Sequence, residues 1–152
     1  MALVAFTMSI ALVGNAVAGE KFKWRIEWNM GKPAVVNVPG EEGQIMSLRE
    51  DKGVLKVLVG SKVMDGMAGV NVGANDMNTK TASGFGHGEI HFTRGEDNMY
   101  WAWEGRAKNG PWSGPATLGK GTGKFAGMKG KATWSLVPVS AEQYYVHWEG
   151  EL

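Results

Sequence analysis

Several stretches of the chain alternate apolar and polar residues, which is the pattern of a β-strand that buries one face. The clearest example covers residues 22–28, where the apolar face comprises Phe22, Trp24, Ile26 and Trp28. Similar patterns predict strands over residues 34–38, 54–63, 84–93, 99–106, 129–137 and 144–149. Residues 44–48 form a less defined segment, and the polar residues 73–80 are expected to form a loop. Since no stretch has a convincing helical period, the pattern predicts an all-β protein.

Seven or eight short strands joined by short turns are typical of a sandwich or a closed barrel. We favour a closed antiparallel β-barrel of about eight strands, because closure leaves no exposed sheet edge. We expect residues 19–152 to form this barrel as a single domain, a size that allows a substantial core.

Glycine has two distinct uses in the pattern. Between Gly119 and Trp134, glycine occurs at 119, 121, 123, 127 and 130, which predicts a tight turn or barrel corner that leads into a strand. Glycines 84, 86 and 88 fall on one face of a predicted strand, where they leave room for a bulky partner such as a tryptophan.

The first 18 residues are apolar and uncharged, and they end in Ala16-Val17-Ala18. This ending is typical of a signal-peptidase site, although the usual positive residues at the start are missing. We therefore expect cleavage after Ala18 and a secreted or periplasmic protein. A membrane span is less favoured, because Gly14 and Asn15 interrupt a run that is already short.

Charge and residue type exclude several kinds of site. Sixteen basic residues against fifteen acidic ones give no basic footprint for nucleic acid, and the absence of cysteine excludes disulfides and thiolate chemistry. His87, Glu89 and His91 alternate along one strand, but the outer two lie about 13 Å apart at the usual rise per residue. One ion would need a further ligand from another strand, such as His147. We therefore predict neither a metal site nor a cofactor.

Seven tryptophans are many for 152 residues, and most fall on the predicted strands. We interpret five of them as the lining of a cavity for an apolar or amphipathic small molecule: Trp24, Trp28, Trp101, Trp103 and Trp134. The alternative is a filled core, since a small eight-stranded barrel can be packed by its own side chains. The protein would then be a structural or interaction module.

The corner Gly121-Thr-Gly-Lys-Phe-Ala-Gly-Met-Lys-Gly130, followed by a strand, resembles the signature of the allene oxide cyclase and dirigent barrel superfamily. The resemblance covers roughly residues 84–150 and agrees with the strand order of bacterial members. It implies an eight-stranded antiparallel barrel with a partly apolar cavity, often assembled as a trimer.

The plant cyclases of this superfamily carry Glu-x-Asn on their first strand, which Glu27-Trp28-Asn29 reproduces here. The resemblance thus implies, as an alternative function, an isomerase or cyclase with Glu27 and Asn29 as candidate catalytic residues. Lys32 stands where those cyclases have a serine, and their cysteine has no counterpart. The alternation also places Glu27 on the face opposite Trp24 and Trp28, which favours ligand binding over catalysis.

Overall fold

The computed structural model describes residues 19–152, and the predicted signal sequence lies outside the described residues. This part of the chain forms antiparallel strands and two single turns of 3₁₀-helix, η1 (Lys62–Met64) and η2 (Gly123–Phe125). The strands are β1 (Lys21–Asn29), β2 (Ala34–Asn37), β3 (Gln44–Val59), β4 (Ala68–Asn78), β5 (Ser83–Arg94), β6 (Asp97–Ala107), β7 (Ser113–Gly121), β8 (Gly130–Pro138) and β9 (Gln143–Glu151). No helix within residues 19–152 is long and apolar enough to cross a membrane.

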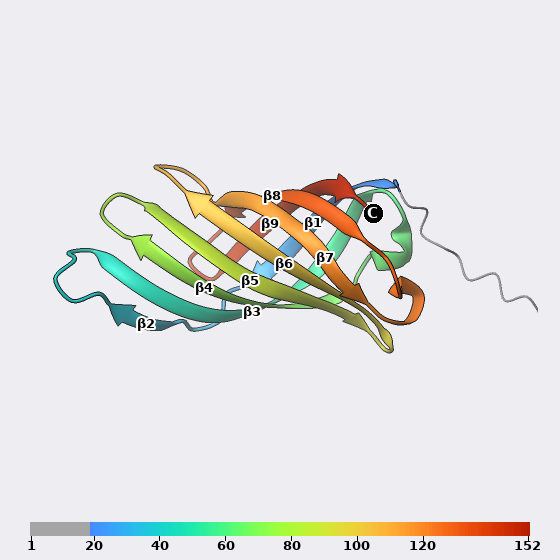
Figure 1. Cartoon of the computed structure of the whole chain (residues 1–152), viewed down its shortest axis with the longest axis horizontal. Coiled ribbons are helices and arrows are strands. Elements are labelled where there is room, and N and C mark those ends of the chain that lie inside the picture. The colour runs from blue at the N-terminus through green and yellow to red at the C-terminus, as the bar shows by residue number, and fades with distance from the viewer. Residues whose placement is uncertain (1–18) are drawn as a thin grey trace, which may run out of the picture.

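Eight of the strands form a closed barrel in the order β1-β9-β8-β7-β6-β5-β4-β3, and β1 pairs with β3 to complete the ring (Figure 1). The prediction of a closed antiparallel barrel is therefore confirmed. The ninth strand, β2, pairs with the first part of β3 and extends the sheet beyond the ring.

One end of the barrel is filled by aromatic side chains. The rings of Phe22 and Trp24 stack with their centroids 3.9 Å apart, and Trp101 lies edge-on to Trp24 and to Trp148 at 5.7 and 5.0 Å. This packed end is the one that carries η1, η2 and the carboxyl terminus (right in Figure 1). The alternation along β1 and β6 thus places large apolar groups inside, as predicted.

The two segments predicted over residues 44–48 and 54–63 are one continuous strand, β3, which ends at Val59. Its second half pairs with β1 and its first half with β2, both along the same edge. Between β1 and β2 the chain passes close to β3, and a Cβ on Gly31 would lie 1.8 Å from the carbonyl oxygen of Glu50. Glycine is therefore needed at this crossing.

The expected loop over residues 73–80 is wrong, because β4 continues to Asn78. Its inward-facing positions include Asn71, Gly73 and Asn75, which line a cavity rather than an apolar core. A strand whose inner face lines a cavity can therefore carry polar residues at its inward-facing positions. A Cβ on Gly73 would lie 2.6 Å from Cζ2 of Trp103, and one on Gly88 would lie 2.8 Å from its Cε2. The prediction that glycines of β5 make room for a tryptophan is confirmed at Gly88.

The glycine-rich corner joins β7 to β8 through η2. Gly123 has a φ of +56°, and a Cβ there would lie 2.2 Å from Oδ1 of Asp97. The same oxygen accepts a 2.9 Å hydrogen bond from the backbone N–H of Lys124. Glycine is thus required at 123 both by the left-handed backbone and by the carboxylate that holds the corner.

Candidate functional site

The half of the barrel away from the packed aromatic end contains a cavity of about 200 Å³. Most of its wall is apolar, and five indole rings contribute to it: Trp28, Trp103, Trp112, Trp134 and Trp148. Aliphatic and methionine side chains complete the apolar wall: Met30, Met77, Ile90, Leu136 and Val146. The polar side chains in the lining come mainly from β3 and β4: Ser47, Arg49, Asp51, Asn71, Asn75 and Tyr144.

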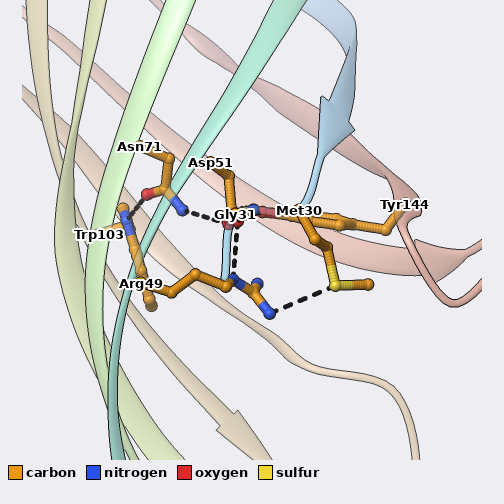
Figure 2. Close-up of polar contacts among 7 residues, drawn as sticks. All are labelled: Met30, Gly31, Arg49, Asp51, Asn71, Trp103 and Tyr144. Carbon is orange, nitrogen blue, oxygen red and sulfur yellow. Dashed lines mark hydrogen bonds and ion pairs between the residues drawn. The ribbon is translucent and has the colours of Figure 1, made fainter. Parts of the chain in front are cut away.

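Asp51 is the centre of this polar group and is 0% exposed (Figure 2). Its Oδ1 accepts a 3.0 Å hydrogen bond from the backbone N–H of Gly31 and lies 2.7 Å from Nε of Arg49. Its Oδ2 accepts from the hydroxyl of Tyr144 at 2.6 Å and from the amide of Asn71 at 3.3 Å. A buried carboxylate is costly unless it is paired and hydrogen-bonded, and Asp51 is both.

The partners of Asp51 are themselves held in place. The carbonyl oxygen of the Asn71 side chain accepts a 2.8 Å hydrogen bond from the indole N–H of Trp103. The guanidinium of Arg49 lies over the ring of Tyr144, 5.6 Å from its centroid. Nη1 of Arg49 donates to the sulfur of Met30 at 3.3 Å, as Figure 2 shows. The cluster therefore presents fixed polar groups to an otherwise apolar cavity.

The hydroxyl of Tyr144 is a hydrogen-bond donor over the whole neutral range. Burial raises its pKa well above the usual value, and the negative charge of Asp51 and the hydrogen bond to that carboxylate raise it further. Each effect disfavours a phenolate beside a buried carboxylate. The proton thus stays on Tyr144 and points to Asp51.

The structure separates the five tryptophans that the sequence grouped together. Trp28, Trp103 and Trp134 line the cavity, whereas Trp24 and Trp101 belong to the packed end of the barrel. The cavity wall also includes Trp112 and Trp148, which the predicted lining omitted.

The two candidate catalytic residues lie away from the cavity. Glu27 faces outward and forms a 2.8 Å ion pair with Arg25. Asn29 is exposed at the end of β1, where it accepts a 2.9 Å hydrogen bond from Gln143.

His87, Glu89 and His91 lie along β5 with their side chains outside the barrel. His91 is 3.1 Å from Asn98 and stacks on Tyr100 with the ring centroids 4.2 Å apart. Within residues 19–152 there is no group of three or more histidines and carboxylates that could hold a metal ion.

The sequence reasoning missed Arg49 and Asp51, which are part of the charged run Arg49-Glu50-Asp51-Lys52. Such a run looks like solvated surface, but the structure turns its residues alternately inward and outward. The signal was the phase of the apolar residues farther along the strand: two-residue steps back from Leu55 reach Gly53, Asp51 and Arg49.

Comparisons with known proteins support the fold alone. The structure of the pterocarpan synthase dirigent protein GePTS1 is similar at a TM-score of 0.54 and 16% sequence identity, over 99% of this chain and 97% of that one. Pyocyanin demethylase is similar at a TM-score of 0.47 and 14% identity, over 84% of this chain and 98% of that one. No family model matches the sequence, and neither does any curated protein. The chain therefore has the barrel fold of the dirigent protein, as its resemblance to the allene oxide cyclase and dirigent superfamily predicted.

Proposed function

We propose that the protein binds a small apolar or amphipathic molecule in the cavity lined by side chains of β1, β3, β4, β5, β6, β8 and β9. The observation that carries this proposal is an aromatic-walled cavity with one convergent polar cluster, centred on Asp51. Pockets for small molecules usually combine apolar walls with a few fixed polar groups, which orient the ligand.

The size of the cavity supports a ligand of one or two rings. An apolar cavity of roughly 150 Å³ is enough to bind benzene, and this one measures about 200 Å³. A barrel core filled by its own side chains would leave no such space, so the cavity favours ligand binding over a purely structural role.

A second candidate function is a proton-transfer isomerisation, which needs no cofactor. The observation that favours it is the short hydrogen bond between Tyr144 and the buried Asp51 in the cavity wall. General acid–base catalysis uses positioned side chains of these types. In such an enzyme these two residues, rather than Glu27 and Asn29, would face the substrate.

The binding proposal is tested with purified residues 19–152 and a panel of one- and two-ring compounds, by tryptophan fluorescence and native mass spectrometry. Val146→Phe narrows the cavity, and Val137→Phe makes the same change on an exposed outer position of β8. We expect micromolar binding that Val146→Phe weakens at least about tenfold, while Val137→Phe leaves it unchanged. Absence of binding across the panel would contradict the proposal.

We also propose that the protein is exported and cleaved after Ala18, which the apolar stretch ending in Ala16-Val17-Ala18 supports. The intact mass of the protein recovered from the periplasm or medium should correspond to a chain that begins at Gly19. Retention of residues 1–18 on a protein found in the cytoplasm would refute it.

A further inference from the structure

We infer that the ligand is an aromatic carboxylate: one or two flat rings that bear a carboxylate group, which the guanidinium of Arg49 binds. This inference rests on the proposed binding function and adds the chemical class of the ligand. Its basis is the geometry and the hydrogen bonding of Arg49.

Arg49 is the one basic side chain among the described residues that line the cavity. Its Nε edge faces Asp51, at 2.7 Å from Oδ1. The contact of Nη1 is the sulfur of Met30, at 3.3 Å. A thioether is a weak acceptor, so a ligand oxygen at this end of the guanidinium would form a stronger bond. The planar end of an arginine can bind both oxygens of a carboxylate at once.

Arg49 is one of several partners of Asp51. Three neutral donors, from Gly31, Asn71 and Tyr144, also bind its two oxygens. Asp51 is also the one acidic side chain in the described lining, so the charges of the pair balance. A ligand carboxylate therefore meets a pair without net charge, whose Nη1 donates to the weak sulfur acceptor of Met30, and it meets no excess of negative charge.

The position of Arg49 suits a ligand whose ring is inside the cavity and whose charge is near the opening. Arg49 is two residues nearer than Asp51 to the start of β3, and its side chain is 26% exposed while that of Asp51 is 0% exposed. The guanidinium is fixed by the ring of Tyr144 below it, so little ordering is required on binding. Five indole rings contribute to the wall of the same cavity, and they favour a flat aromatic group.

The volume limits the size of the aromatic group. About 200 Å³ accommodates one or two rings inside the barrel, whereas a long acyl chain or a polycyclic skeleton would extend beyond it. The inferred class is thus small aromatic acids.

The test compares a carboxylate with its neutral isostere by isothermal titration calorimetry near pH 7.5 on residues 19–152. The probes are 2-naphthoate and 2-naphthamide, with benzoate and benzamide as the matched single-ring pair. We expect the carboxylate of at least one pair to bind about tenfold or more tightly than the amide, as is typical of a charge-assisted hydrogen bond. Arg49→Met should abolish that preference. The matched control is Arg106→Met, since Arg106 is exposed on the outside of β6.

Equal binding of acid and amide in both pairs would overturn the inference while the binding proposal stands. If none of the four probes binds while uncharged members of the panel of one- and two-ring compounds do bind, the carboxylate class is wrong. If nothing binds at all, both proposals fail. The preference of the unaltered chain decides the question even where Arg49→Met does not fold. Arg49→Lys provides a second variant, which should keep the charge but weaken the preference because it lacks the planar fork.

Discussion

The hydroxyl of Tyr144 on β9 donates a 2.6 Å hydrogen bond to Oδ2 of Asp51 on β3, 93 positions earlier in the chain. The two strands are not paired with each other, because β1 lies between them in the sheet. The bond therefore spans β1 on the inner face of the barrel and joins two strands of the cavity wall. The stability of the barrel and the shape of the cavity depend on the same contact.

Tyr144→Phe should lower the free energy of unfolding by about 1.5–3 kcal/mol, the usual range for a hydrogen bond to a charged group. The substitution removes one donor from a carboxylate that is 0% exposed, and no solvent can replace it. Urea denaturation at neutral pH measures the change.

Tyr145→Phe provides the matched control, since Tyr145 is the next residue and points to the outside of the barrel beneath the guanidinium of Arg25. It should cost less than about 0.5 kcal/mol, as surface substitutions usually do. If both substitutions lower the free energy of unfolding equally, the hydrogen bond from Tyr144 to Asp51 does not stabilise the barrel.

The pKa of Tyr144 predicts a loss of stability at alkaline pH. Burial, followed by the charge of Asp51, raises this pKa above the value near 10 of an unfolded chain. Above about pH 10 the unfolded chain releases the proton while the folded one retains it, so the unfolded state becomes favoured. The stabilisation is complete below about pH 10 and decreases by up to about 1.4 kcal/mol per pH unit above it.

The free energy of unfolding, measured in urea between about pH 8 and pH 11, should fall more steeply for the unaltered chain than for Tyr144→Phe. Subtracting the two curves removes the groups that titrate in both proteins. A constant difference across this range would mean that the pKa of Tyr144 is ordinary in the folded state.

The sequence contained enough to predict the ring of strands but not the cavity chemistry. Phe22, Trp24, Ile26 and Trp28 alternate without interruption, and such a pattern fixes which face is buried. The strands that line the cavity lack this apolar alternation, because some of their inward-facing side chains are polar. The run around Asp51 therefore resembled surface, and β4 resembled a loop.

The alternation of apolar and polar residues also could not predict which inward-facing residues pack in the core and which line the cavity. Trp101 and Trp103 occupy equivalent inward positions of β6, yet one is in the filled end and the other lines the hollow. What separates them is the residue that each meets on neighbouring strands. Gly73 and Gly88 make room beside Trp103, and these contacts depend on register that a single sequence does not reveal.

Gly73→Ala should destabilise the barrel by about 1–3 kcal/mol, the usual cost of overpacking. The new Cβ would lie 2.6 Å from Cζ2 of Trp103 and would displace that indole. The displacement also weakens the 2.8 Å hydrogen bond from Trp103 to Asn71, a partner of Asp51. Urea denaturation measures the loss, and any ligand found for the cavity should bind more weakly.

A double-mutant cycle with Trp103→Leu tests this explanation, since the smaller side chain leaves space for the added methyl. Gly73→Ala should then cost less in the Trp103→Leu background than in the unaltered chain. The control is Gly110→Ala, because a Cβ on Gly110 would meet only the carbonyl oxygen of Lys108, at 3.9 Å. Additive effects at 73 and 103 would exclude steric conflict as the cause.

Asp97→Asn should destabilise the glycine-rich corner. It should also remove the loss of stability that protonation of Asp97 causes in the corner at acid pH. The hydrogen bond from the backbone N–H of Lys124, followed by that from the Lys124 side chain, holds the pKa of Asp97 below 3.8. The stabilisation is therefore present above that pH and is lost as the pH falls through the lower folded pKa. Hydrogen exchange at the Lys124 amide should be faster in Asp97→Asn at neutral pH, while the neighbouring change Glu96→Gln should leave it unaltered. If the amide exchanges equally fast in both variants, the carboxylate does not hold the corner, and the left-handed backbone at Gly123 alone accounts for its shape.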